Sequence, residues 1–87
     1  MPTKRKGTVA KINAVRGMVA IQTQDDGFTI IELMEDWDLK IGDELIWNNG
    51  YGLGFTTYVN ASNGSQADVL AQNHSVPEAL LRQQLQF

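Results

Sequence analysis

The sequence predicts a small, mainly β domain in which five short strands form a barrel and a short helix follows at the C-terminus. Three observations lead to this prediction. Runs rich in β-branched and aromatic residues recur along the chain, turn signals containing glycine separate them, and a helix-start pattern occurs near the end. With 87 residues, 43% of them hydrophobic, the chain can close one modest core.

The first sixty residues supply the predicted strands. The segments with β-branched or alternating apolar residues are 8–12, 18–23, 28–33, 44–47 and 55–59. Gly17 marks the first turn, and Asp25-Asp26-Gly27 marks the second because Asp-Gly tolerates a positive φ. Short strands with frequent turns favour a closed barrel, since closure removes unprotected sheet edges. We therefore expect a basic arm over 1–5 and the barrel over 6–60.

The C-terminal part changes its pattern. Residues 61–74 are polar and are predicted to be a linker, with a helical turn within 66–72 as the alternative. Ser75 and Glu78 form a capping box around Pro77, which predicts a helix over 75–87. Val76, Leu80, Leu81 and Leu85 give it an apolar stripe. A helix this short is marginal alone, so it must dock against the rest of the protein.

Charge is divided along the chain. The net charge is −3, yet residues 1–24 hold no acid and carry Lys4, Arg5, Lys6, Lys11 and Arg16, whereas 25–44 hold only Lys40 among many acids. One interpretation is solvated surface that keeps the chain soluble. The other is a basic edge that meets a phosphate backbone, because affinity for nucleic acid comes largely from cations that release counterions.

Catalytic signals are weak. There is no cysteine, so a disulfide or a thiolate metal site is excluded. His74 has no second imidazole or nucleophile near it in sequence and is expected to be solvated, and the acids lack the spacing of a calcium loop. We expect no catalytic residue, metal or cofactor, and hence no enzyme. Without an apolar leader or an 18-residue apolar run, we expect a monomeric cytoplasmic protein with no membrane partner.

The order of turn motifs resembles a known family. Lys6-Gly7-Thr8-Val9, then Asn13-Ala14 with Arg16-Gly17, Asp25-Asp26-Gly27 and Gly42-Asp43-Glu44-Leu45 are similar to the cold-shock domain, a five-stranded oligonucleotide-binding (OB) barrel. The resemblance covers residues 6–60 approximately. It implies the barrel and the binding of single-stranded nucleic acid.

The chain departs from that family where bases stack. The segments Lys11-Ile12, Met18-Val19-Ala20 and Ile30-Ile31-Glu32 match positions that carry aromatic residues in cold-shock domains, and here they carry none. Each lost ring removes about 1–3 kcal/mol of stacking per base, so binding should be weak. The residues expected to contact single-stranded RNA or DNA are Lys4, Arg5, Lys6, Lys11, Arg16, Met18, Trp37 and Tyr51.

A protein-interaction module is the alternative function. If they lie on the outer face of the sheet, the apolar residues that replace the rings form an aliphatic patch, which monomeric proteins rarely leave uncovered. Its members are Ile12, Met18, Ala20 and Ile30. Either the helix over 75–87 or an unidentified protein should cover it, unless a register shift places these residues in the core. Trp37 is read as a lid over one barrel end or as a partner contact.

Overall fold

The computed structural model of the protein describes residues 4–23, 27–48 and 52–86. Within these ranges the chain forms six strands and a short helical segment. The elements are β1 (Arg5–Asn13), β2 (Met18–Thr23), β3 (Phe28–Leu33), β4 (Glu44–Trp47), β5 (Gly54–Asn60), β6 (Ser65–Val76), the 3-10 turn η1 (Glu78–Leu80) and α1 (Leu81–Gln84). The mainly β class, the barrel and the C-terminal helix are confirmed, but there are six strands and not five.

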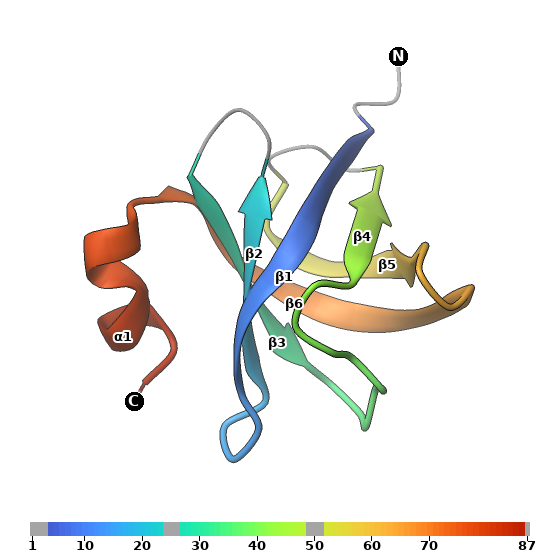
Figure 1. Cartoon of the computed structure of the whole chain (residues 1–87), viewed down its shortest axis with the longest axis horizontal. Coiled ribbons are helices and arrows are strands. Elements are labelled where there is room, and N and C mark those ends of the chain that lie inside the picture. The colour runs from blue at the N-terminus through green and yellow to red at the C-terminus, as the bar shows by residue number, and fades with distance from the viewer. Residues whose placement is uncertain (1–3, 24–26, 49–51, 87) are drawn as a thin grey trace.

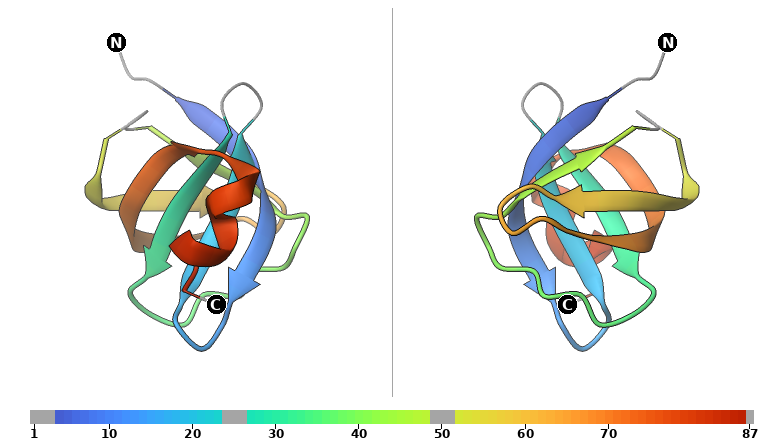
Figure 2. Two further views of the ribbon diagram at one scale, coloured as in Figure 1. Left: turned by 90° about the vertical axis from the view of Figure 1, so that its left-hand side faces the viewer. Right: turned by 90° about the vertical axis from the view of Figure 1, so that its right-hand side faces the viewer.

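The strands close into one barrel. Their order around it is β1-β2-β3-β6-β5-β4, and every neighbouring pair is antiparallel. Two three-strand meanders, β1-β2-β3 and β4-β5-β6, are therefore joined by the β3–β6 and β1–β4 pairings, and α1 lies outside the barrel (Figures 1 and 2). Closure pairs the edges of both meanders, which removes exposed backbone donors and acceptors.

The sixth strand corrects the predicted linker. Residues 61–64 turn the chain, and from Ser65 to Val76 it is extended, so neither a linker over 61–74 nor a helical turn within 66–72 is present. The physical reason is an alternation of burial, in which Ala67, Val69 and Ala71 are buried while the residues between them face outward. This period of two is what one strand needs when one of its faces lines a barrel.

The helical segment is shorter than predicted. Val76 still pairs with Phe28 in the sheet, so the helix does not begin at Ser75. The residue preceding η1 is Pro77, and no side chain caps it, so the predicted capping box does not form. Ser75 has a φ of 57° and lies within β6, where the pairing with β3 shifts between Asn73 and Val76.

Buried apolar side chains form two clusters, one on each side of β2 and β3. The interior cluster fills the barrel with Val9, Val19, Ile21, Ile31, Leu45, Trp47, Tyr58 and Val69. The outer cluster lies between these strands and the helical segment and contains Met18, Ala20, Phe28, Ile30, Val76, Leu81 and Leu85. Strands buried on both faces lose the simple alternation of apolar and polar residues, which explains the nearly continuous apolar runs of β2 and β3.

Candidate functional site

The face expected to bind bases or a partner is covered by the protein's own C-terminal segment. Met18, Ala20 and Ile30 are 4%, 0% and 0% exposed, because Leu81 and Leu85 pack over them. They therefore form no exposed aliphatic patch, and Met18 is not available to a base in this structure. The sequence left two possibilities for what covers this face, the C-terminal helix or another protein, and the structure shows the C-terminal helix.

Ile12 belongs to the other side of the sheet. It is half-buried and packs against the interior cluster. The pairing of β1 with β2 shifts between Val9 and Lys11, after which Ile12 pairs with Val19. An irregularity of this kind changes which side chains face inward, so Ile12 does not share a surface with Met18.

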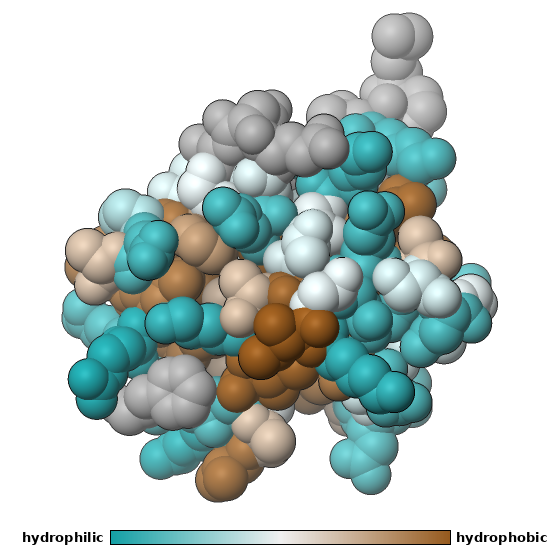
Figure 3. Space-filling model, in the orientation of Figure 1, coloured by the Kyte–Doolittle hydropathy of each residue, from teal (hydrophilic) through white to brown (hydrophobic). Residues whose placement is uncertain are grey.

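The predicted cations lie mostly on the surface. Lys4, Lys6, Lys11 and Arg16 are exposed, and Arg5 is half-buried with its guanidinium carbon 6.0 Å from the centre of the Trp47 ring. Hydrophilic side chains gather around the start of β1, at the upper right of Figure 3. β1 thus places lysines along its outward side, whereas Arg16 lies in the turn between β1 and β2.

One hollow adjoins these lysines. Its volume is ≈ 410 Å³, and we call it the β4–β5 groove, lined by Lys4, Ile46, Trp47, Asn48, Thr57, Val59 and Gln66. Strand pairing explains the arrangement, because Lys6 pairs with Ile46, Ile46 with Val59, and Val59 with Gln66 across four neighbouring strands. Asn48, Thr57 and Gln66 were not predicted as site residues, since only the register brings them together.

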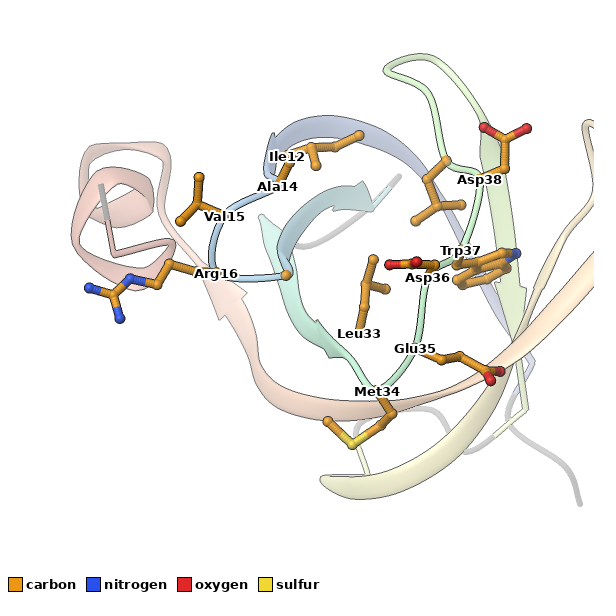
Figure 4. Close-up of a pocket in the computed structure, with 12 residues that line it drawn as sticks. Ile12, Ala14, Val15, Arg16, Leu33, Met34, Glu35, Asp36, Trp37 and Asp38 are labelled. Atoms are coloured by element: carbon orange, nitrogen blue, oxygen red, sulfur yellow. The ribbon is translucent and has the colours of Figure 1, made fainter.

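A second hollow lies at the end of the barrel between the β1–β2 turn and the β3–β4 segment (Figure 4). Its volume is ≈ 690 Å³, and we call it the mouth hollow. Trp37 and Arg16 both line it. Trp37 is half-buried against the interior cluster and its Nε1 donates a hydrogen bond of 2.9 Å to Ser65 Oγ. Tyr51, the remaining residue expected to contact nucleic acid, lies outside the described residues.

His74 is a structural residue and not the solvated one expected. It is half-buried, with Nδ1 2.9 Å from the Thr29 hydroxyl and Nε2 3.0 Å from the Gly52 carbonyl oxygen. A carbonyl only accepts, so Nε2 carries the proton, and the Thr29 hydroxyl donates to Nδ1 when the ring is neutral. The ring therefore joins β6 to β3 and to the segment before β5.

Asp43 is also a structural acid. Its Oδ2 accepts hydrogen bonds from Asn60 Nδ2 at 2.8 Å and from the Lys40 amide at 3.0 Å. The bond from Asn60 contributes most, and together the two bonds hold the pKa of Asp43 below its ordinary value of 3.8. The side chain therefore stays ionised and fixes the turn before β4. In the part of the chain that the structure describes, His, Asp and Glu side chains form no group of three suited to a metal ion.

The described helices are too short to cross a lipid bilayer. No protein-family model, curated protein or solved structure matches the chain.

Proposed function

We propose that this protein is a non-enzymatic binding module whose ligand is single-stranded nucleic acid, held on the outward side of β1 and in the β4–β5 groove. The observation that carries the proposal is the position of Lys4 in the groove, with Lys6 in the cross-strand row beside it. Lys11 continues the exposed cations along β1. A phosphate backbone requires such a line of cations next to a surface that receives bases.

The β4–β5 groove combines apolar and hydrogen-bonding side chains, both of which a nucleic-acid base can contact. Ile46 and Val59 provide an apolar floor, and Asn48, Thr57 and Gln66 carry hydrogen-bonding groups at its sides. An unstacked base has two apolar faces and a polar edge, so it can lie on the floor while its edge contacts amide or hydroxyl groups. Aliphatic side chains lack the stacking contribution of aromatic rings, so we expect weak and salt-sensitive binding with little sequence preference.

This proposal uses a different surface from the one that the cold-shock resemblance implies. The outer side of β2 and β3 is covered by Leu81 and Leu85, and the groove lies across β4, β5 and the start of the chain. Binding in the groove leaves the C-terminal segment docked. The proposal therefore predicts no change in the signals of the outer cluster when nucleic acid is added.

The test is a titration of a labelled short oligouridylate at several salt concentrations. The affinity of the wild-type chain should fall as salt rises, and each lost phosphate contact should reduce the log–log slope by about 0.7, so that Lys4→Gln/Lys6→Gln reduces it by about 1.4. The matched control is Lys40→Gln/Arg82→Gln, which removes the same charge from exposed residues outside the groove. Absence of binding by the wild-type chain, or equal losses in both double variants, contradicts the proposal.

A further inference from the structure

The mouth hollow has an apolar floor that packs against the interior cluster. Ile12, Leu33 and Leu39 line it, and each is half-buried and packed against the interior cluster. Its volume of ≈ 690 Å³ lies within the range of natural ligand pockets. A surface of this kind receives an apolar chain, because burying apolar area is favourable in proportion to the area removed from water.

Trp37 fixes the wall of the hollow. Its indole donates to Ser65 Oγ, which in turn donates to Asn63 Oδ1 at 2.6 Å. In Figure 4 the indole lies on one side of the β3–β4 segment, and the neighbouring Asp36 projects to the other side, toward Leu33 and the middle of the hollow. Anchoring Trp37 in the barrel thus directs the Asp36 carboxylate over the apolar floor.

The charges around the hollow favour a cation. Glu35, Asp36 and Asp38 line it, and Arg16 is the one basic side chain among the described residues that line it. In Figure 4 the Arg16 guanidinium and the Glu35 and Asp38 carboxylates are directed away from the middle of the hollow, and the Asp36 carboxylate is directed toward it. An anion would meet an uncompensated carboxylate there, whereas a cation with an aliphatic stem would satisfy both the floor and Asp36.

We propose that the mouth hollow binds an arginine or lysine side chain presented by a basic segment of a protein partner. The aliphatic stem lies on Ile12 and Leu33, and the charged end meets Asp36. Such side chains combine an apolar stem with a charged head, which matches the arrangement of floor and carboxylate. This inference does not depend on the nucleic-acid proposal, because no described residue lines both the mouth hollow and the β4–β5 groove.

The experiment uses the full chain labelled with ¹⁵N and two blocked peptides, one of alternating glycine and arginine and one of alternating glycine and glutamine. The arginine peptide should shift the amide signals of Gly17, Leu33 and Asp36 and the indole signal of Trp37 in a saturable way. The glutamine peptide should leave them in place. A response to both peptides, or arginine-induced shifts elsewhere on the surface, overturns the proposal.

Two matched variants make the result specific. Asp36→Asn should weaken binding of the arginine peptide about threefold, as expected for one solvent-exposed charge pair. Glu78→Gln removes the same charge from an exposed residue of η1 and should leave the affinity unchanged. Equal losses in the two variants would show attraction to net charge only and would overturn the proposal. Asp36→Asn should not weaken oligouridylate binding, which keeps this proposal and the nucleic-acid proposal separable.

Discussion

The side-chain amide of Asn13, at the end of β1, donates a buried hydrogen bond of 2.8 Å to the carbonyl oxygen of Leu85, 72 residues later in the chain. This bond joins the first strand to the last described turn. The Leu85 side chain packs in the outer cluster with Met18 and Ile30. The polar and apolar contacts of one residue thus hold the C-terminal segment over the face that the sequence resemblance assigns to ligand binding.

Replacing Leu85 tests how strongly that segment is docked. Leu85 is 0% exposed, and Leu80, in the same segment, is 43% exposed. Truncation of a buried leucine leaves a cavity as well as losing burial, so Leu85→Ala should lower the free energy of unfolding by about 2–5 kcal/mol. Chemical denaturation measures this value, and binding of a hydrophobic dye should rise as Met18 and Ile30 become accessible. Leu80→Ala is the control, and an effect as large as that of Leu85→Ala would show that the segment is not held by its buried side.

Tyr58 carries a polar atom that the barrel interior does not satisfy. Its ring is 0% exposed and stacks on Trp47 with centroids 4.6 Å apart, but its hydroxyl has no hydrogen-bond partner among the residues that the structure describes. Burial also raises the pKa of Tyr58 above its ordinary value of 10.0, so the side chain stays neutral. Tyr58→Phe keeps the stacking and removes the orphaned hydroxyl, and should raise the free energy of unfolding by about 1–2 kcal/mol.

The matched variant for Tyr58 is Tyr58→Leu. It also removes the hydroxyl but loses the ring that stacks on Trp47, so it should destabilise the protein. Thermal and chemical denaturation of the two variants separate the hydroxyl from the ring. A loss of stability in Tyr58→Phe would show that the hydroxyl contributes a favourable interaction, and would contradict the prediction.

The sequence predicted the barrel because its β-branched runs and glycine turns are local signals. It did not predict β6, because the inward residues Ala67 and Ala71 are small and the outward ones are polar, which gives the composition of a linker. Only pairing with β3 and β5 makes this segment a strand. The same limit applies to His74, whose ring joins three segments that are distant in sequence.

The candidate sites were predicted less well for a related reason. The cations and Trp37 were identified from residue type, but the β4–β5 groove depends on a row across four strands that no local pattern shows. Ile12 was wrongly predicted to share a face with Met18, Ala20 and Ile30. The shift in pairing between Val9 and Lys11 turns Ile12 toward the barrel interior, and the amino-acid composition does not reveal such a shift. Register is a property of paired strands, so one strand's sequence does not determine it.

Asp43 should make stability depend on pH in the acid range. Its folded-state pKa is lowered below 3.8 by the bond from Asn60 and the Lys40 amide. The contribution of a group with a depressed pKa is fully present above the pKa of the unfolded chain and is lost as the pH falls through the folded-state pKa. The free energy of unfolding should therefore decline below a pH of about 4, the ordinary pKa of this carboxyl group.

The comparison of Asp43 with Asp43→Asn isolates this effect. The variant cannot ionise, so it should be less stable than the wild-type chain at neutral pH, and the difference should shrink as the wild-type carboxylate becomes protonated. Denaturant titrations at a series of pH values give both curves. Glu44→Gln, an exposed acid next in sequence, should follow the wild-type curve. A constant difference between Asp43→Asn and the wild-type chain across the acid range would contradict this account.

Gly7 is required by the contact between β1 and β2. It is buried, and a methyl group there would lie 2.6 Å from Cγ2 of Ile21 and 2.7 Å from the carbonyl oxygen of Gln22. The Ile21 side chain can rotate, but the Gln22 carbonyl belongs to the paired backbone, so relief requires the two strands to separate. Gly7→Ala should therefore lower the free energy of unfolding by about 1–3 kcal/mol, the usual cost of overpacking.

The control for Gly7 is the adjacent residue of the same strand. Thr8 is exposed, so Thr8→Ala changes β propensity without inserting an atom between strands, and it should cost less than about 1 kcal/mol. Hydrogen exchange adds a local readout, since Gly7→Ala should accelerate exchange of the amides that pair β1 with β2 more than those between β5 and β6. If Gly7→Ala were as stable as Thr8→Ala, close strand contact would not explain the glycine in the Lys-Gly-Thr-Val segment, and the β1–β2 register that places Lys6 and Lys11 outward would need revision.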